Sequence, residues 1–171
     1  MTTMFIMAQV FGLLASAATI ASVQFKKKEH ILILVIIGSI FFTINYVLLE
    51  AYSGAATCAL GVVISSTIFL VEKMGRRVKW WLAAIFALAL LVSVILTFQT
   101  HIDILPFVSS MFWLSSMLQR DENRLRWLLM GNTVGWAIYG IVMAAYTGLI
   151  ASVFSIVSIS IALIRFRKKG R

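Results

Sequence analysis

Apolar residues follow one another in long uninterrupted runs along this chain, and the short segments between the runs hold nearly all of its charged residues. Such a run predicts an α helix that is apolar on every side, because a helix at the surface of a water-soluble domain keeps one polar face. The predicted helices span residues 5–23, 31–49, 55–71, 80–99, 104–118, 127–144 and 149–164.

The composition agrees with helices that are surrounded by lipid. Of the 171 residues, 61% are hydrophobic and 12% are charged, and the mean hydropathy is +1.00. Soluble domains carry about 25% charged residues, so this chain lacks the polar surface that water requires. The predicted fold class is therefore an all-α integral membrane protein with a bundle of seven transmembrane helices. Several runs are shorter than the ~20 residues of a typical span and need flanking residues to cross a bilayer.

The basic residues predict the orientation of this bundle. Every Lys and Arg lies in the first, third or fifth segment between the predicted helices or in the C-terminal tail, and the other segments have none. The positive-inside rule makes the basic side cytoplasmic, which places the N-terminus outside and the C-terminus inside. The net charge of +9 thus reflects topology and not a nucleic-acid-binding face. The residues assigned to topology and to lipid head-group contact are Lys26, Lys27, Lys28, Arg76, Arg77, Arg165, Arg167 and Lys168.

An internal repeat relates the two ends of the chain. The segment Ala51-Tyr52-Ser53-Gly54 matches Ala145-Tyr146-Thr147-Gly148 at a spacing of 94 residues, and scattered further positions match at the same spacing. Three predicted helices precede and three follow the helix at 80–99. We therefore predict a 3+1+3 parallel repeat. Its parts are 5–71 for the first three-helix unit, 80–99 for the linker helix, 104–164 for the second unit and 165–171 for the basic tail.

Several short motifs resemble a known family. They are Ala8-Gln9-Val10-Phe11-Gly12, the turn Ala51-Tyr52-Ser53-Gly54-Ala55, Leu105-Pro106 and Ile164-Arg165-Phe166. Over nearly its whole length the chain resembles the bacterial inner-membrane YgjV family, small proteins without an assigned activity. This resemblance implies an inner-membrane location with a periplasmic N-terminus. The family is in turn similar to the SWEET and PQ-loop transporters, in which a small solute crosses between two three-helix bundles. The Pro-Gln dipeptides of PQ-loop proteins are absent here, and Pro106, the only proline, is the predicted hinge.

Polar and aromatic residues inside the predicted helices suggest a binding pocket. The candidates for a central solute site are Asn45, Tyr46, Trp113, Asn132, Trp136, Tyr139 and Ser155. Amides would hydrogen-bond a solute while aromatic rings stack on its apolar face. The alternative is that the polar residues bond to neighbouring helices and let them pack closely. For Asn45 and Asn132 the sequence leaves both interpretations open.

Ionisable groups are scarce within the apolar runs. His101 and Asp103 are predicted to be solvated loop residues, with an outer gate or a pH-sensitive pair as the alternative. The one cysteine, Cys58, is predicted to be a small residue at a helix contact, and it excludes a disulfide within the chain. No metal-ligand spacing, phosphate loop or nucleophile with a histidine partner is present. We therefore expect neither an enzyme nor a cofactor.

Two functions remain open from the sequence. The first is a facilitator or transporter of SWEET-like architecture for a small neutral solute. The second is a non-transporting membrane module that binds a protein partner or lipid through its helix faces. The sequence does not decide the oligomeric state.

Overall fold

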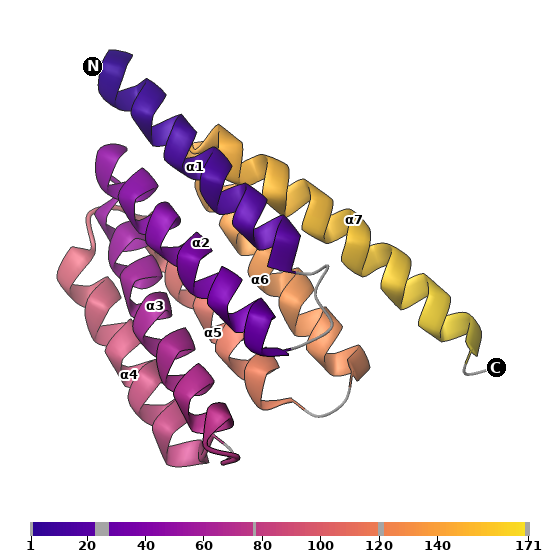
Figure 1. Cartoon of the computed structure of the whole chain (residues 1–171). Coiled ribbons are helices and arrows are strands. Elements are labelled where there is room, and N and C mark those ends of the chain that lie inside the picture. The colour runs from indigo at the N-terminus through magenta and orange to yellow at the C-terminus, as the bar shows by residue number, and fades with distance from the viewer. Residues whose placement is uncertain (1, 23–27, 77, 120–121, 170–171) are drawn as a thin grey trace.

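The computed structural model describes residues 2–22, 28–76, 78–119 and 122–169, and these residues form helices throughout, with no strand (Figure 1). The all-α prediction is therefore confirmed for the described part of the chain. The elements are α1 Thr2–Ser22, α2 Lys28–Leu48, α3 Tyr52–Lys73, α4 Trp80–Thr97, the short 3₁₀ helix η1 His101–Asp103, α5 Ile104–Leu118, α6 Glu122–Val142 and α7 Tyr146–Lys169.

The helices are longer than several of the apolar runs that predicted them. Helix α6 begins at Glu122 and α2 begins at Lys28, each several residues before its run starts. A helix satisfies its own backbone hydrogen bonds, so it continues past the lipid-facing part into polar residues. Among the described residues, Thr3–Ser22, Tyr52–Lys73 and Trp80–Thr97 are long and apolar enough to cross a membrane, whereas Leu32–Leu48 and Tyr146–Ser160 are shorter apolar helices.

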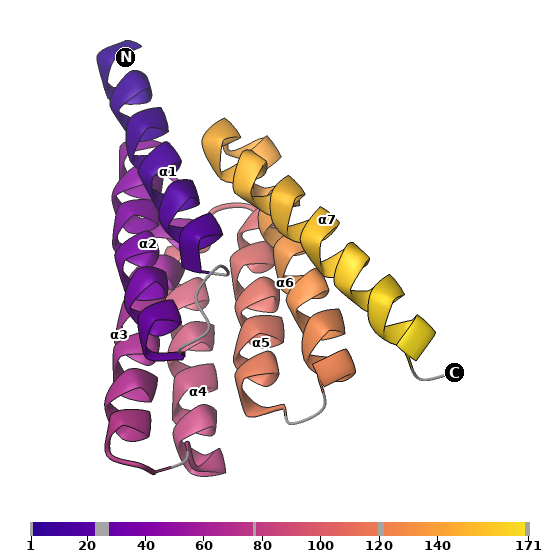
Figure 2. The same ribbon diagram turned by 45° about the vertical axis from the view of Figure 1, so that its right-hand side comes forward.

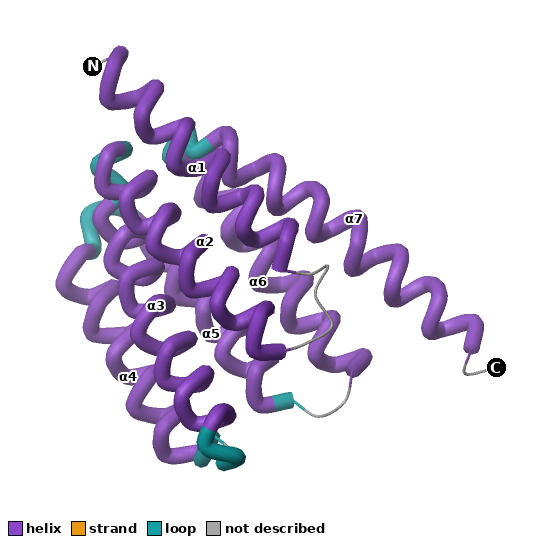
Figure 3. The backbone as a smooth tube through the Cα atoms, in the orientation of Figure 1, coloured by secondary structure: helices purple, strands orange, loops and turns teal. Residues whose placement is uncertain are grey.

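The connections between helices gather at two opposite ends of the bundle (Figures 1 and 3). We call the end with residues 49–51, 98–103 and 143–145 the turn end, because its connections are short. The other end holds residues 74–76, 78–79 and the start of α6, and we call it the basic end. Helix α1 starts at the turn end, and α7 reaches its last residues at the basic end.

The helices form two groups with α4 beside them, as Figure 2 shows. In the first half α1 packs on α2 and α2 on α3, and in the second half α5 packs on α6 and α6 on α7. Contacts of α1 with α7 and of α3 with α5 join the two halves, while α4 packs against α3 and α5. These six helices therefore close into a ring, and α4 covers one of its two seams.

An apolar cluster fixes the seam that α4 covers. Its buried residues come from α2, α3, α4 and α5 and are Leu32, Ile64, Ile68, Phe86, Leu90 and Leu114. Because lipid tails are as apolar as these side chains, close packing and dispersion hold the cluster together in a membrane.

Helices α2 and α6 end in the same way. Glu50 and Ala144 both have a positive φ, 58° and 54°, and each follows the last turn of its helix. The next backbone N–H reaches back five residues along the chain, from Ala51 to the Tyr46 carbonyl and from Ala145 to the Gly140 carbonyl, both at 2.9 Å. This is the Schellman arrangement, which supplies donors to the last carbonyls of a helix. The corresponding residues of the two turns are 94 positions apart.

Glycine allows close approach where the two halves meet. A Cβ on Gly12 would overlap the Thr147 hydroxyl and lie 3.0 Å from the Asn45 amide nitrogen. A Cβ on Gly54 would lie 2.6 Å from the Tyr139 ring. Neither position accepts a methyl group without displacing a side chain of the neighbouring helix, so both glycines allow the close contact between helices.

We expect Gly12→Ala to destabilise the protein, because overpacking a tight contact costs about 1–3 kcal/mol. The thermal unfolding midpoint of the detergent-purified protein measures this loss. Gly61→Ala is the matched control, since the nearest atom to its added Cβ would be Ser39 Oγ at 3.9 Å. Equal midpoints for the two variants would contradict the packing role of Gly12.

Candidate functional site

A buried carboxylate organises the turn end. Asp103 is only 4% exposed, and its Oδ1 accepts a hydrogen bond from the Ser53 hydroxyl of α3. Its Oδ2 accepts the backbone N–H of Gln99 at 2.9 Å and of Thr100 at 2.7 Å, and the Thr100 hydroxyl lies at 3.2 Å. Four donors therefore surround a group that has almost no contact with solvent. We call this set of residues, together with Tyr139, the Asp103 cluster.

The proton positions in this cluster follow from the donors. Ser53 donates its single hydroxyl hydrogen to Asp103. The Tyr139 hydroxyl, 2.9 Å from the Ser53 hydroxyl, is therefore the donor in the bond between them. The Tyr139 oxygen in turn accepts the backbone N–H of Gly54 at 3.0 Å. The chain of bonds runs from α6 through α3 to η1, and it ties the second half of the bundle to the first.

A second set of hydrogen bonds joins the halves between α1 and α7. The Gln9 amide donates to the Ala144 carbonyl at 2.9 Å, and its oxygen accepts the Thr147 N–H at 3.3 Å and the Thr147 hydroxyl at 3.2 Å. The Ser16 hydroxyl donates to the Thr147 carbonyl at 2.8 Å. We call this the Gln9 cluster.

The two clusters pair the same positions of the chain. Gln9 and Asp103 are 94 residues apart, and so are Ser53 and Thr147. Asp103, just ahead of α5, bonds a hydroxyl of the first half, and Gln9 bonds a hydroxyl of the second half. Each half therefore uses the same position of the repeat to bond a hydroxyl of the other half. The bonding group is a carboxylate in one cluster and an amide in the other.

Aromatic rings lie next to the Asp103 cluster. The ring centroids of Tyr46 and Trp136 are 5.7 Å apart, those of Tyr46 and Tyr139 are 5.5 Å apart, and those of Trp136 and Tyr139 are 5.9 Å apart. These are distances at which aromatic side chains attract one another. The rings connect α2 to α6 beside the Asp103 cluster.

A cavity of about 500 Å³ lies between the two halves. Its lining residues come from α1, α2, α3, α5, α6 and α7, and they range from Tyr46 and Trp136 near the turn end to Ser22, the last residue of α1. The described lining contains no Asp, Glu, Lys, Arg or His. Its size is within the usual range for small-molecule sites.

Five of the seven predicted site residues line this cavity, namely Tyr46, Trp113, Asn132, Trp136 and Ser155. The other two are placed elsewhere. Asn45 donates its amide to the Ala8 carbonyl at 2.6 Å and packs against Gly12, so it joins α2 to α1. Tyr139 is fully buried in the Asp103 cluster. These two residues bond to neighbouring helices and do not line the cavity.

The predicted hinge and the residues assigned to topology do not line the cavity, and for several of them the structure does not describe the side chain. Pro106 is fully buried in the first turn of α5. A backbone N–H in the first turn has no acceptor within the helix, so a proline there breaks no hydrogen bond and does not interrupt the helix. Its position therefore gives no support to a hinge. Arg76 is exposed at the basic end. Lys26, Lys27 and Arg77 lie outside the described residues, and of Lys28, Arg165, Arg167 and Lys168 only the helical backbone is described.

Two polar atoms in the cavity wall have no hydrogen-bond partner. They are the Asn132 side-chain oxygen and the hydroxyl of Ser65, which is 0% exposed. A buried polar atom without a partner costs about 1–3 kcal/mol, so such atoms need an explanation in a native structure. Asn132 is on α6 and Ser65 is on α3, so each half contributes one of them.

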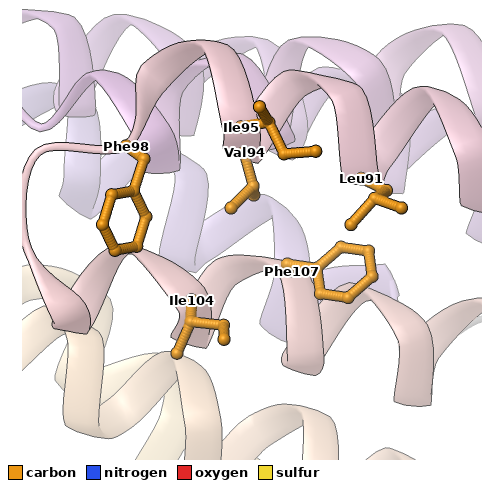
Figure 4. Close-up of a pocket in the computed structure, with 6 residues that line it drawn as sticks. All are labelled: Leu91, Val94, Ile95, Phe98, Ile104 and Phe107. Atoms are coloured by element: carbon orange, nitrogen blue, oxygen red, sulfur yellow. The ribbon is translucent and has the colours of Figure 1, made fainter.

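A second hollow, between α4 and α5, has a different chemistry. Figure 4 shows the six apolar side chains around it, which are Leu91, Val94, Ile95, Phe98, Ile104 and Phe107. Its volume is about 400 Å³. Because these side chains offer no hydrogen bond, the hollow suits a hydrocarbon chain and not a polar solute.

The structure corrects one expectation for the loop before α5. His101 is exposed as predicted, but Asp103 is buried and bonded to α3. The sequence contained a signal for this contact, since Asp103 lies 94 residues after Gln9 and both residues follow the repeat spacing. The spacing could be interpreted only once the structure showed the partners, Ser53 for Asp103 and Thr147 for Gln9.

The sequence model of the bacterial inner membrane protein family Imp-YgjV matches residues 6–170 of this chain. The chain belongs to the Imp-YgjV family. No curated protein and no solved structure matches it. The resemblance seen in the sequence motifs is therefore confirmed at the level of the family, and it identifies this Imp-YgjV protein as a bacterial inner membrane protein.

We expect Tyr139→Phe to destabilise this Imp-YgjV protein, because the buried Gly54 N–H loses its acceptor and Ser53 loses its donor. The expected loss is about 1–3 kcal/mol for the orphaned groups. The thermal unfolding midpoint checks it. Tyr146→Phe is the control, since Tyr146 is 56% exposed and its loss of a hydroxyl should leave the midpoint unchanged. Equal midpoints for the two variants would contradict the contribution of the Tyr139 hydroxyl to stability.

Asp103 also predicts how stability depends on pH. Burial raises the pKa of its carboxyl, but the hydrogen bonds from Ser53, Thr100 and Gln99 outweigh burial, and the pKa lies below its ordinary 3.8. A carboxyl with a lowered pKa in the folded state stabilises the protein at neutral pH and loses this contribution as the pH falls through the folded pKa.

The thermal midpoint should therefore change little on account of Asp103 between pH 5 and pH 8 and decline at more acidic pH. Asp103→Asn should lower the midpoint at neutral pH and flatten the acidic decline. Glu50→Gln, at an exposed carboxyl of the same end, is the control. An acidic decline as steep in Asp103→Asn as in the wild type would remove Asp103 as its cause.

Proposed function

We propose that this protein is a facilitator for small uncharged solutes across the bacterial inner membrane, with the cavity between its halves as the solute site. The cavity itself carries the proposal. It lies between the two groups of three helices, all six of which line it, and it presents amide, hydroxyl and aromatic side chains. Interior sites with a few polar groups on a mainly apolar wall are typical of small-molecule binding.

The absence of ionisable side chains from the described lining favours an uncharged solute. Moving an isolated charge from water into an apolar interior costs far more than moving a neutral polar group. A charged solute would therefore need an opposite charge in the wall, and the described lining offers none. A catalytic role is not part of this proposal.

The proposal includes seven membrane-spanning helices in a 3+1+3 parallel repeat, with the N-terminus in the periplasm and the C-terminus in the cytoplasm. Basic residues at alternate connections support this orientation. Three observations at a spacing of 94 residues support the repeat. They are the positive φ values of Glu50 and Ala144, the matching backbone bonds that end α2 and α6, and the exchanged bonds of Gln9 and Asp103.

We further propose that the structure represents the state open to the cytoplasm. The Asp103 cluster, the Gln9 cluster and the rings of Tyr46 and Trp136 all lie toward the turn end, which is periplasmic in the proposed orientation. The cavity lining continues in the other direction, to Ser22 and Ile159. Movement of the halves that breaks both clusters would open the cavity to the periplasm.

The alternative function is a membrane module that binds lipid or a protein partner without transport. The apolar hollow between α4 and α5 favours a lipid contact of this kind. It does not account for the unpartnered Asn132 and Ser65 inside the bundle, which have no use in a module that acts through its outer faces.

Cys58 provides a direct test, because it is the only cysteine of the chain and lines the cavity. A small, membrane-impermeant maleimide should label Cys58 in inside-out vesicles, where the cytoplasmic side is accessible. It should label Cys58 much more slowly in right-side-out vesicles, because the turn end is closed.

The control is Cys58→Ser, which sets the background labelling. Equal slow labelling from both sides, while detergent-denatured protein labels fully, would mean that the cavity is closed to water. That result would contradict the facilitator and favour the membrane module.

A further inference from the structure

The polar groups of the cavity wall differ in whether their donor hydrogens are already used in bonds within the protein. The hydroxyls of Thr19, Thr57 and Thr133 donate to backbone carbonyls of their own helices at 2.7–2.9 Å. Ser22 and Ser152 do the same at 2.7 Å and 3.1 Å. Each of these hydroxyls has already used its hydrogen, so toward the cavity it offers acceptor lone pairs.

Asn132 contributes an amide that is engaged with no other group of the described chain. Its oxygen has no partner, and its nitrogen donates no hydrogen bond to any described residue. A carboxamide presents an acceptor and a donor side by side, so its complement is a group with a donor and an acceptor in the same spacing. Amides, lactams and vicinal diols have this edge.

Apolar surface lies next to the amide. Trp136 is four residues after Asn132 and therefore on the same face of α6, one turn nearer the turn end. Trp113 and Tyr46 also line the cavity, from α5 and α2. A solute bonded to Asn132 thus has aromatic rings within the same wall, which favours a compound with an apolar ring or face beside its polar edge.

We propose that Asn132 and Ser65 form the recognition site of the cavity for an uncharged solute that carries a hydrogen-bond donor next to an acceptor, beside an apolar face. This inference rests on the proposed function and adds the class of solute. The donor is the decisive group, because the wall offers an excess of acceptors and the Asn132 oxygen is a buried acceptor without a partner. Ser65 on α3 supplies a further hydroxyl from the opposite half, so an occupied site bridges both halves.

The test uses the labelling rate of Cys58 in inside-out vesicles as a measure of occupancy. The amide probe is nicotinamide, with N,N-dimethylnicotinamide as the analogue without a donor and nicotinate as the charged analogue. The diol probe is cis-1,2-cyclohexanediol, with its dimethyl ether as the analogue without donors. These arms distinguish an amide solute from a diol solute.

We expect at least one of the two parent probes to slow labelling about tenfold at ten times its apparent Kd, since labelling then reports the unoccupied fraction. The methylated analogues and nicotinate should not slow it. In Asn132→Leu and in Ser65→Ala the protection should be lost or strongly reduced, measured against the unprotected rate of the same variant.

Thermal unfolding separates this role from a structural one. A side chain that serves a solute and not the fold is a polar group without a partner, so Asn132→Leu should unfold at the same temperature as the wild type or at a higher one. A large decrease in the midpoint would indicate a structural amide and overturn the inference.

Three results for the probes would also overturn it: protection by the methylated analogues equal to that of their parents, protection retained in Asn132→Leu, or no protection by any probe. In each of these cases labelling of Cys58 from the cytoplasmic side still supports the facilitator. If Cys58 is not labelled in inside-out vesicles at all, the proposed function itself fails.

Discussion

The bundle depends on one requirement, that a carboxylate buried among helices must be surrounded by donors. Asp103 meets it with Ser53 from α3 and with the backbone and side chain of the segment that precedes α5. Ser53 can donate to Asp103 and still be fully bonded because Tyr139 of α6 donates to it. Three elements that are distant in sequence are thereby held in one geometry. An unpaired buried charge would be far more costly than any single apolar contact in the bundle.

The Gln9 cluster makes the corresponding contact on the other seam without a charge. Together the two clusters close one end of the ring at two places, between η1 and α3 and between α1 and α7. Only one of these seams is also covered by α4, whose packing against α3 and α5 adds an apolar contact with no equivalent at α1 and α7. The two seams therefore differ in their contacts, and the seam between α1 and α7 combines its hydrogen bonds with the close approach at Gly12.

The polar groups at the turn end and those in the cavity differ in whether they have hydrogen-bond partners. At the turn end each of the groups around Asp103 has a partner within the protein, which is the normal condition for buried polar atoms. In the cavity Asn132 and Ser65 have none. Fully bonded polar groups give rigidity, whereas unpartnered ones create a demand that a solute or water can meet. This contrast separates the part of the molecule that holds the halves together from the part that is available for binding.

The sequence by itself determined the helices, because apolar segments in lipid must satisfy their backbone hydrogen bonds internally and a helix does so locally. It also indicated the family, through motifs along the whole chain, and five of the seven site residues that it suggested line the cavity. It could not separate Asn45 from Asn132, since both are amides in the middle of apolar runs. Only the tertiary structure separated them, because the Asn45 nitrogen donates to the Ala8 carbonyl of α1 and no described group bonds the Asn132 side chain, although the oxygens of both amides lack a partner. The same holds for Asp103, whose burial depends on Ser53 of α3, a residue 50 positions away in the chain. Hydrophobic pattern is a property of each segment, whereas the partner of a polar group depends on how the segments are packed.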